Sequence, residues 1–252
     1  MDIGTYAAAS LGIVQLRKLE IQNNNLANVN TVGFKRQILV TSPENFDETF
    51  AKQIKDKDPY ASGDQDRVST VNEVATHTDF SMGAIKSTGN PLDVALRNPN
   101  EFFVVNTPQG RMYTRAGNFT LDANGTIVTQ DGMQVQGDGG AITAQGAGVN
   151  IGADGTVRAG ANIVGRLQIV RFAETKGLQP NEGTRFKIVS GPQPTPVEGF
   201  VEPRSLEMSN VSAVTGMIDL ITTNRAFDAY TKAAQTIDSL NQAAITQVGR
   251  RQ

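Results

Sequence analysis

The sequence of 252 residues contains no cysteine, no tryptophan and a single histidine, His77. Without cysteine there is no disulfide, no thiol nucleophile and no zinc site with cysteine ligands. A metal site built from several histidines is excluded too, and a Ser-His-Asp triad would have to use His77. Because His77 lies in a threonine-rich stretch, residues 74–80, a structural role is the simpler interpretation.

An excess of one charge is also missing, because 23 Lys and Arg residues stand against 25 Asp and Glu residues. This balance gives no field to attract a polyanion, which argues against nucleic acid as the main partner. No apolar run approaches the roughly 18 residues of a membrane span. The first residues lack a basic segment, and Arg17 and Lys18 interrupt the apolar run that follows. We therefore expect no cleaved secretory signal.

Glycine and proline divide the chain into three zones. Nineteen of the 25 glycines lie between Gly83 and Gly199, and all ten prolines lie between Pro43 and Pro203. The middle is therefore predicted to be turns and strands, and the proline-free ends to be helices. The expected fold is α+β, with paired N- and C-terminal helices forming a coiled-coil-like inner domain beside a central β-rich domain. Its predicted parts are an N-terminal helix of the inner domain (1–36), a connector (37–85), a β-rich outer domain (86–202) and a C-terminal helix of the inner domain (203–252).

The N-terminal helix is predicted over residues 4–30. Its apolar residues recur in steps of three and four, the spacing that places side chains on one helical face: Tyr6, Ala9, Ile13, Leu16, Leu19 or Glu20, and Leu26 or Ala27. Amide side chains and a glycine between residues 28 and 33 favour its end.

The C-terminal helix is predicted over residues 210–248, with Ser209 or Asn210 as its cap. At 1.5 Å per residue it would be roughly 58 Å long, and the N-terminal helix is its candidate partner within the chain. The apolar positions that repeat along it are Val214, Met217, Ile221, Phe227, Tyr230, Ala234, Ile237, Leu240, Ala244 and Val248.

The C-terminal helix has few charges for a helix in water. Residues 210–248 contain five charged side chains and seven alanines, with Thr, Ser, Asn and Gln filling many other positions. A two-stranded coiled coil normally has charged e and g positions. We infer that this helix is surrounded by other copies or other chains when it works; a weakly charged helical hairpin is the alternative.

The middle zone is predicted to form strands over residues 101–105, 111–114, 163–172 and 184–189. Three turn dipeptides separate short apolar runs and predict hairpins: Asn124-Gly125, Asp131-Gly132 and Asp154-Gly155. This pattern fits a sandwich, a barrel or an irregular β domain, and it leaves the strand order open.

Residues 37–85 are harder to interpret. Ser42-Pro43-Glu44-Asn45 resembles a capped helix start, with Phe46 and Phe50 on one face of that helix. Residues 55–67 form a charged, turn-rich connector.

No constellation for chemistry emerges. The segment 146–152 has glycines like those of a nucleotide loop, but the third is misplaced and no helix follows. Four carboxylates could in principle supply an acid/base pair: Asp122, Asp131, Asp138 and Asp154. Most of them adjoin turn glycines, where Asp is used for its bonds to the backbone. We therefore predict no catalytic, cofactor-binding or metal-binding residue and no small-molecule substrate.

Three segments carry residue combinations that periodicity does not demand. They are Asn23-Asn-Asn-Leu-Ala-Asn-Val-Asn-Thr-Val-Gly-Phe-Lys35, then Gly89-Asn-Pro-Leu-Asp-Val-Ala-Leu96 with Phe102-Phe103 and Tyr113-Thr-Arg-Ala-Gly117, and finally Leu206-Glu-Met-Ser-Asn-Val211 with Asn224-Arg-Ala-Phe227. Together they resemble the flagellar basal-body rod and hook family, in order and in position. The resemblance extends over all three zones.

The resemblance implies an axial subunit that polymerises through its terminal helices into the rod, the drive shaft of the flagellum, and it implies no enzymatic activity. Its partners would be copies of itself, neighbouring rod proteins and the flagellar type III export apparatus. It would be exported without a cleaved signal to the periplasmic rod of the basal body. The short chain leaves no room for the outer domain of a hook subunit. Residues 78–91 most resemble the proximal rod member, with the distal rod member second.

From the motifs and the helical spacing we predict a set of packing residues, within the helix pair or between subunits. Asn28, Asn30 and Gly33 would end the first helix in left-handed geometry, and Phe34 would anchor the chain that leaves it. The set is Tyr6, Ile13, Leu16, Asn24, Asn25, Leu26, Asn28, Gly33, Phe34, Leu206, Asn210, Val211, Val214, Ile221, Arg225, Phe227, Tyr230, Ile237 and Leu240. Tyr113 and Arg115 are interpreted as residues that pack the β domain.

One departure from the family pattern concerns the step before the paired phenylalanines. The family commonly has glycines there, whereas this chain has Arg97-Asn-Pro-Asn-Glu-Phe-Phe103, which puts the turn type in doubt. Two other hypotheses compete with the rod subunit. One is an extracellular β-rich binding module, for example for glycans, although only 6% of residues are aromatic. The other is a peptidoglycan-cleaving enzyme, which would need a pair of carboxylates in a cleft.

Overall fold

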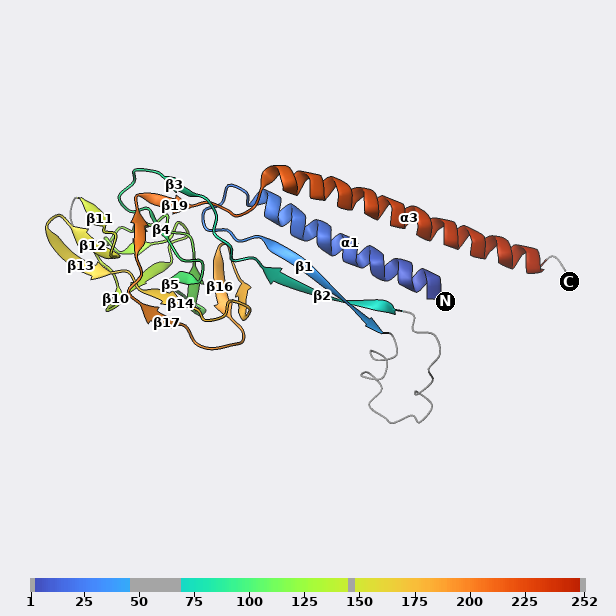
Figure 1. Cartoon of the computed structure of the whole chain (residues 1–252), viewed down its shortest axis with the longest axis horizontal. Helices are drawn as coiled ribbons and strands as arrows, with labels where there is room; N and C mark the ends of the chain where they lie inside the picture. The colour runs from blue at the N-terminus through green and yellow to red at the C-terminus, as the bar shows by residue number, and fades with distance from the viewer. Residues whose placement is uncertain (1–2, 46–68, 145–147, 250–252) are drawn as a thin grey trace, which may run out of the picture. The chain divides into compact units, whose positions relative to one another are not determined.

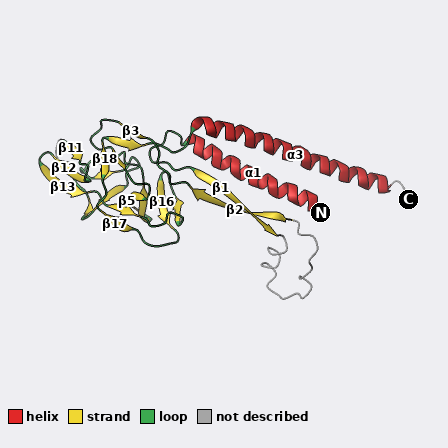
Figure 2. Cartoon of the chain, viewed as in Figure 1, coloured by secondary structure: helices red, strands yellow, loops and turns green. Residues whose placement is uncertain are grey.

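The computed structural model describes residues 3–45, 69–144 and 148–249 (Figure 1). Contacts divide the chain into two compact units, and each unit is built from segments that are far apart in the sequence. The helical unit takes residues 1–24, 37–77 and 213–252, and the β unit takes residues 25–36 and 78–212, as far as these are described. Figure 2 shows helices at both ends of the chain and strands between them, the α+β content expected from the sequence.

Helix α1 (Ile3–Ala27) ends where the sequence predicts. The backbone then turns, because Asn28 N–H donates to Asn25 O at 3.2 Å and Thr31 N–H donates to Asn28 O at 3.2 Å. Gly33 adopts a positive φ of 69°, as predicted. The asparagines do not, since Arg204 is the one residue other than glycine with a positive φ in the described chain. The prediction of left-handed Asn28 and Asn30 is therefore wrong.

Helix α3 (Ala213–Gly249) contains 37 residues and is about 55 Å long. It begins three residues after Asn210, so Ser212 rather than Ser209 or Asn210 occupies the N-cap position. Several threonine hydroxyls bond back to the helix itself, as Thr231 does to Phe227 O and Thr236 to Lys232 O, both at 2.9 Å. These hydroxyls need no water, which suits a helix with apolar surroundings.

The helical unit also contains a two-stranded sheet of β1 (Gln37–Asn45) and β2 (Ser69–Thr78). The residues predicted to start a helix, Ser42 to Asn45, lie in β1, so that prediction is wrong. Pro43 cannot donate to a ladder, and a two-stranded sheet tolerates it because each strand has one unpaired edge. Phe46, Phe50 and the connector 55–67 lie outside the described residues.

The β unit is dominated by a ten-stranded sheet with the order β15-β16-β6-β5-β9-β8-β7, to which β10, β14 and β17 are attached. Its strands are β5 (Glu101–Thr107), β6 (Gly110–Thr114), β7 (Thr120–Leu121), β8 (Ile127–Val128), β9 (Gln134–Gly137), β10 (Gly140–Ala141), β14 (Ile169–Arg171), β15 (Leu178–Pro180), β16 (Arg185–Ile188) and β17 (Thr195–Val197). Three smaller sheets pair β11 (Val149–Ile151), β12 (Thr156–Ala159) and β13 (Asn162–Arg166); β4 (Val94–Leu96) and β18 (Val201–Pro203); and β3 (Ile85–Ser87) and β19 (Ser205–Glu207).

All three predicted hairpins form. Asn124-Gly125 joins β7 to β8, Asp131-Gly132 joins β8 to β9, and Asp154-Gly155 joins β11 to β12. Two carboxylates serve the turns, since Asp122 Oδ1 accepts Thr126 N–H at 2.7 Å and Asp154 Oδ1 accepts the Thr156 hydroxyl at 2.6 Å, whereas the Asp131 carboxylate pairs with Arg185. The bonds from the Thr156 hydroxyl and backbone N–H also lower the pKa of Asp154. The turn interpretation of these two carboxylates agrees with this geometry.

One predicted strand is two strands. The run 163–172 breaks after Arg166, so that β13 joins the three-stranded sheet and β14 joins the ten-stranded sheet. At the break, Leu167 N–H donates to Gly155 O and Gln168 N–H donates to Gln136 O, both at 2.9 Å. Gly155 lies in the β11–β12 turn of the three-stranded sheet and Gln136 lies in β9 of the ten-stranded sheet, so the chain changes sheet although its apolar run continues.

Strand β5 is covered on both faces, which explains the paired phenylalanines. Phe103 and Val105 belong to one hydrophobic core, and Phe102 and Val104 belong to a second core that is rich in aromatic rings. Before this strand, Glu101 N–H donates to Asn98 O at 3.3 Å without any residue of positive φ, so the turn forms without glycine. The alternation along β5 thus feeds two cores from one strand.

Candidate functional site

The first candidate surface is on helix α3, which has two apolar rows. One row is shielded from solvent and repeats in alternating steps of three and four: Ala213, Gly216, Leu220, Thr223, Phe227, Tyr230, Ala234 and Ile237. Thr223, in the middle of it, is 2% exposed. This spacing is typical of a coiled-coil seam. The pairing of this helix with α1 stays a prediction.

The second row on α3 faces outward. Val214, Met217, Ile218 and Ile221 follow one another at i, i+3, i+4 and i+7, and they are between 51% and 71% exposed. Leu240, further along, is 63% exposed. At 100° per residue the four residues lie roughly 150° around the helix from the shielded row. We call these four residues the outward row; Leu240 points in a different direction and is not part of it.

Helix α1 has the same division on a smaller scale. Val14, Ile21 and Asn25 are shielded, each less than 10% exposed. Ile13 and Leu16 are 66% and 47% exposed. Each terminal helix therefore combines a shielded set with apolar side chains that remain in solvent.

The predicted packing residues divide accordingly. Those shielded or partly shielded are Asn25, Leu26, Asn28, Gly33, Phe34, Leu206, Asn210, Val211, Phe227, Tyr230 and Ile237. Those exposed are Ile13, Leu16, Asn24, Val214, Ile221, Arg225 and Leu240. Tyr6 lies in α1, and its side chain is not among those described. Their packing roles remain predictions. The sequence analysis did not single out Val14, Ile21 or Thr223, which are among the best-shielded helix positions.

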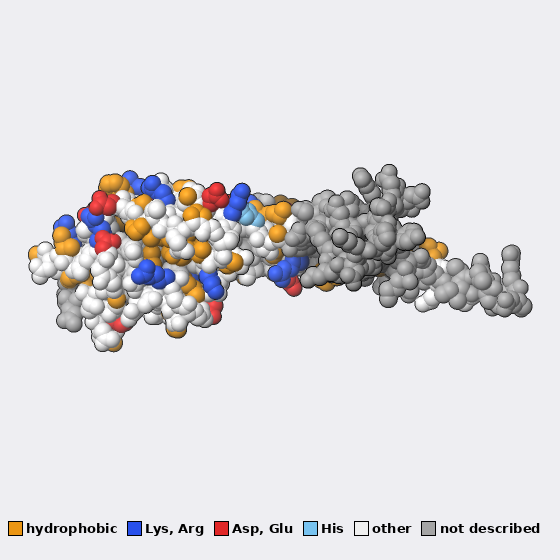
Figure 3. Space-filling model, turned by 90° about the horizontal axis from the view of Figure 1, so that it is seen from below, with side chains coloured by type: hydrophobic (Ala, Val, Ile, Leu, Met, Phe, Trp, Pro, Cys, Tyr) orange, Lys and Arg blue, Asp and Glu red, His pale blue; other side chains and the backbone are white. Residues whose placement is uncertain are grey.

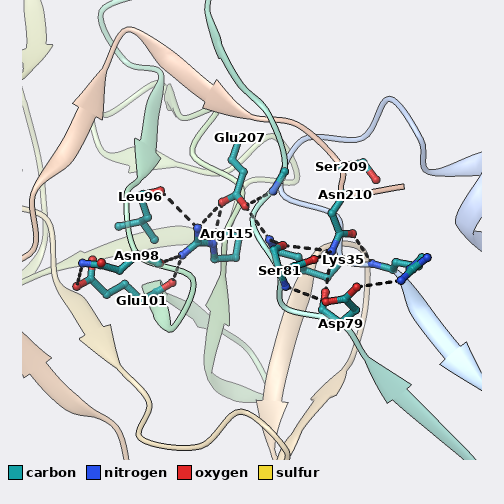
Figure 4. A network of polar contacts seen from close by, with 12 residues as sticks. Lys35, Asp79, Ser81, Leu96, Asn98, Glu101, Arg115, Glu207, Ser209 and Asn210 are labelled. Carbon is teal, nitrogen blue, oxygen red and sulfur yellow. Dashed lines mark hydrogen bonds and ion pairs between the residues drawn. The ribbon is translucent and has the colours of Figure 1, made fainter. Parts of the chain in front are cut away.

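A second candidate site lies inside the β unit, where charged side chains are buried. Lys35, Glu207 and Arg115 have no exposed side-chain surface. Lys35 Nζ lies 2.7 Å from Glu207 Oε1, and Arg115 Nε lies 2.8 Å from Glu207 Oε2 (Figure 4). One carboxylate thus compensates two cations, one from the segment after α1 and one from the segment after β6.

Backbone groups complete this arrangement. Lys35 Nζ also donates to Ser81 O at 2.6 Å, and Gly83 N–H donates to Glu207 Oε1 at 3.1 Å. The Arg115 guanidinium donates to Glu101 O at 2.6 Å and lies over the Phe102 ring, 5.8 Å from its centroid. Arg115 and Tyr113, which is 7% exposed, therefore pack the domain, as interpreted from the sequence.

Burial shifts the pKa of both cations. Desolvation lowers the pKa of Lys35, although the nearby Glu207 carboxylate works in the opposite direction. Desolvation likewise lowers the pKa of Arg115 against the influence of Glu207. The cost of burying two cations is therefore only partly offset by one carboxylate.

Asn210 joins three segments of the chain beside these charges. Its Oδ1 accepts Arg36 N–H at 2.8 Å, and its Nδ2 donates to Asp79 O at 2.9 Å and to Ser81 O at 3.2 Å (Figure 4). Arg36 also pairs with the Asp79 carboxylate at 3.1 Å. The Asp79 carboxylate is partly buried, which opposes ionisation, yet bonds from Ser81 and Arg36 lower its pKa. We call Lys35, Arg36, Asp79, Ser81, Arg115, Glu207 and Asn210 the junction cluster.

Two glycines allow the segments to approach this closely. A Cβ on Gly33 would lie 2.3 Å from Ala116 N, and one on Gly83 would lie 1.9 Å from Met208 O. Gly33 N–H in turn donates to Glu207 O at 2.8 Å. Any side chain at either position would push the backbones apart.

The sequence contained one signal for the junction cluster. Lys35 and Glu207 are charged residues that stand next to apolar neighbours within the motifs, Phe34 and Leu206. Such residues are rarely buried without a partner. The partner itself could not be named, since the two positions are 172 residues apart.

The described surfaces have no other feature that points to chemistry. Within residues 3–45, 69–144 and 148–249, no group of three or more His, Asp or Glu side chains could hold a metal ion. None of the described helices is long and apolar enough to cross a membrane. Figure 3 shows cationic, anionic and hydrophobic side chains interspersed on the face of the β unit in view. That face offers no extended field of one sign.

Three family models match the chain in succession. They are a flagella basal body rod protein model at residues 8–35, a flagellar hook protein FlgE/F/G D1 domain model at residues 98–159, and a flagellar basal body rod FlgEFG protein C-terminal model at residues 202–247. These matches include both terminal helices and the central strands.

Curated relatives match over nearly the full length. The flagellar basal-body rod protein FlgF of Caulobacter vibrioides is 32% identical over 254 residues, which cover 99% of this chain and 99% of that protein. The flagellar basal-body rod protein FlgG of Bacillus subtilis is 31% identical over 249 residues, 90% of this chain and 92% of that protein. FlgF of Rhizobium meliloti is 30% identical over 255 residues, 99% of both chains.

Proposed function

Because this chain belongs to the flagellar basal-body rod protein family, we propose that it polymerises through its two terminal helices into the rod of the basal body. The chain is a structural protein of that assembly, and its partners are other rod and basal-body subunits. The outward row on α3 carries the proposal. It remains in solvent although a separate row on the same helix is shielded.

The energetics favour covering the outward row. Fully burying one Val, Ile or Met side chain stabilises by about 1.5–3 kcal/mol, and the row offers four such side chains within three helical turns. Exposed apolar rows of this kind mark interaction surfaces. Ile13 and Leu16 on α1 provide a second, smaller contact. A neighbour that covers both helices would build the many-sided packing that a rigid shaft needs.

The composition of α3 supports the same proposal. Residues 210–248 contain only five charged side chains, so few groups on its surface carry the large desolvation cost of a charge. Threonine hydroxyls that bond within the helix reduce the desolvation cost further. A neighbouring subunit can therefore approach this helix while burying few charges.

An assembly experiment tests this proposal. Ile221→Lys, on the outward row, should abolish incorporation into purified basal bodies and swimming in soft agar, since it would bury a charge between subunits. Ala233→Lys is the matched control on the same helix, because Ala233 is exposed and belongs to neither row. We expect Ala233→Lys to incorporate. Normal incorporation of Ile221→Lys would contradict the proposal.

Within the rod, we propose the proximal position. Support comes from full-length similarity to proteins named FlgF, and from the resemblance of residues 78–91 to the proximal member. The distal position is the alternative, since proteins named FlgG are nearly as similar. Complementation separates them. The gene should restore motility in a strain that lacks its FlgF and fail in one that lacks its FlgG.

We also propose export through the flagellar export apparatus without a cleaved signal, and residence in the periplasmic part of the rod. The apolar stretch near the N-terminus is interrupted by Arg17 and Lys18, which supports the absence of cleavage. Mass spectrometry of the protein from purified basal bodies should detect peptides that precede Arg17. Loss of all of them would contradict the proposal.

A further inference from the structure

The junction cluster lies next to the places where the chain leaves the β unit. The chain passes from one unit to the other after residues 24, 36, 77 and 212. Lys35 and Arg36 directly precede one of these points, Asp79 and Ser81 follow another, and Glu207 and Asn210 precede the last.

Hydrogen bonds of the junction cluster join the chain segments at three of these points to one another. Asn210 bonds the segment before α3 to Arg36 and to the backbone of Asp79 and Ser81. Asp79 N–H donates to Arg36 O at 2.8 Å, and this bond directly joins the segments next to the crossings after residues 36 and 77. Glu207 then ties the segment before α3 to Lys35 and, through Arg115, to the core that contains Phe102.

The buried charged and amide groups of the junction cluster fix the positions of the segments more than they add to the free energy of unfolding. A buried group of two cations and one carboxylate gains little net free energy, whereas its geometry admits one arrangement of the donors. Apolar contacts alone would allow the three segments to slide. An amide that accepts one backbone bond and donates to two carbonyls fixes the segments in register.

We propose that Asn210 is a positioning residue. Together with Glu207 it holds three segments of the β unit at fixed spacing, next to the points where the chain passes between the units after residues 36, 77 and 212. We call this arrangement the clasp. The segments that lead to β1, β2 and α3 then have defined positions in the β unit. For assembly, the consequence is that the polymerising helices connect to the β unit at fixed positions, and this consequence rests on the proposed function. The clasp itself is a property of the isolated chain and can be tested without assembly.

Amide hydrogen exchange of the full-length chain tests the clasp. Its reporters are the amides of Arg36, Asp79 and Gly83, which bond to Asn210 Oδ1, Arg36 O and Glu207 Oε1. The amides of Ile127 and Leu167, two residues of the hydrophobic core that contains Phe103, donate to Ile142 O and Gly155 O at 2.9 Å and report opening of the whole unit. Asn210→Ala should accelerate exchange at the Arg36 and Asp79 amides about tenfold and leave the core amides unchanged.

Two further variants make the result specific. Asn210→Asp keeps an acceptor for Arg36 N–H but loses the donor to Asp79 O and Ser81 O, so it should restore part of the protection of the Arg36 amide. Asn162→Ala, at an exposed position of β13, should leave every reporter unchanged. Equal acceleration of the core amides in Asn210→Ala would overturn the proposal, since the cluster would then be one more part of a cooperative fold. Unchanged exchange rates of the Arg36 and Asp79 amides in Asn210→Ala would overturn it too.

Discussion

Lys35 Nζ and Glu207 Oε1 lie 2.7 Å apart with both side chains wholly buried, although 172 positions separate the two residues. The N-terminal segment 25–36 is therefore part of the β unit in which Glu207 lies. A fragment that begins after residue 36 would lose a cation from the middle of this unit. The segment after the N-terminal helix and the segment before the C-terminal helix therefore both contribute to the β unit.

The first prediction compares the two ends of this ion pair. Glu207→Gln leaves Lys35 and Arg115 buried without their carboxylate, and we expect it to lower the free energy of unfolding by about 3–5 kcal/mol. Lys35→Met leaves a neutral Arg115–Glu207 pair and should cost about 1–2 kcal/mol at most. Urea unfolding followed by circular dichroism measures both. Equal losses in the two variants would mean that the Lys35 charge, and not the buried carboxylate alone, is needed for stability.

The second prediction concerns acid. The pKa of Asp79 is lowered in the folded state from an ordinary value of 3.8, so folding favours the ionised carboxylate. Its contribution to stability is fully present above about pH 3.8 and is lost as the pH falls through the lowered folded pKa. The difference in unfolding free energy between the wild type and Asp79→Asn should therefore shrink below that pH.

The matching control removes a partner of the carboxylate instead. Arg36 pairs with Asp79 at 3.1 Å, so Arg36→Met should weaken the pH dependence without abolishing it, because Ser81 N–H still donates to Asp79 Oδ1 at 3.0 Å. A difference between wild type and Asp79→Asn that stays constant from neutral pH to pH 2 would contradict a lowered pKa.

The third prediction uses two glycines of similar backbone conformation. Gly33 has a φ of 69° and a Cβ there would lie 2.3 Å from Ala116 N, whereas Gly89 has a φ of 79° and open space around it. Gly89→Ala should cost about 1 kcal/mol of backbone strain. Gly33→Ala adds a backbone clash next to the junction cluster and should cost about 3 kcal/mol or more. Thermal unfolding of both variants measures the excess. Equal costs would mean that the Gly33 and Ala116 backbones separate easily.

The sequence predicted the elements whose signals are local. Asn124-Gly125, Asp131-Gly132 and Asp154-Gly155 each carry their turn geometry in two residues, and all three hairpins form. The break between β13 and β14 was not predictable in this way. Its cause is the bonding of Leu167 to the β11–β12 turn and of Gln168 to β9, while the sequence presents one continuous apolar run.

For the candidate site too, local features could be predicted from the sequence and contacts between distant segments could not. Helical spacing identifies apolar positions on α3, but two rows on different faces satisfy it, and only tertiary contacts decide which one is shielded. Thr223 is 2% exposed while Ile221 is 51% exposed, the reverse of what hydrophobicity predicts. The partners of Lys35 and Asn210 depend on distant segments, so a local pattern could mark these residues as unusual without naming their contacts.

The fourth prediction concerns Arg204, which joins β18 to β19 and has a φ of 54°. Its carbonyl accepts Thr88 N–H at 2.8 Å and Gly89 N–H at 3.2 Å, and these bonds hold the residue in a conformation that costs a side chain about 1 kcal/mol. Arg204→Gly should relieve this strain and raise the midpoint of urea unfolding, equivalent to a gain of about 0.5–1 kcal/mol. Arg204→Ala is the matched control, because it removes the same exposed side chain and keeps the strain. If the glycine and alanine variants unfold at the same midpoint, the exposed guanidinium rather than the backbone conformation determines the effect.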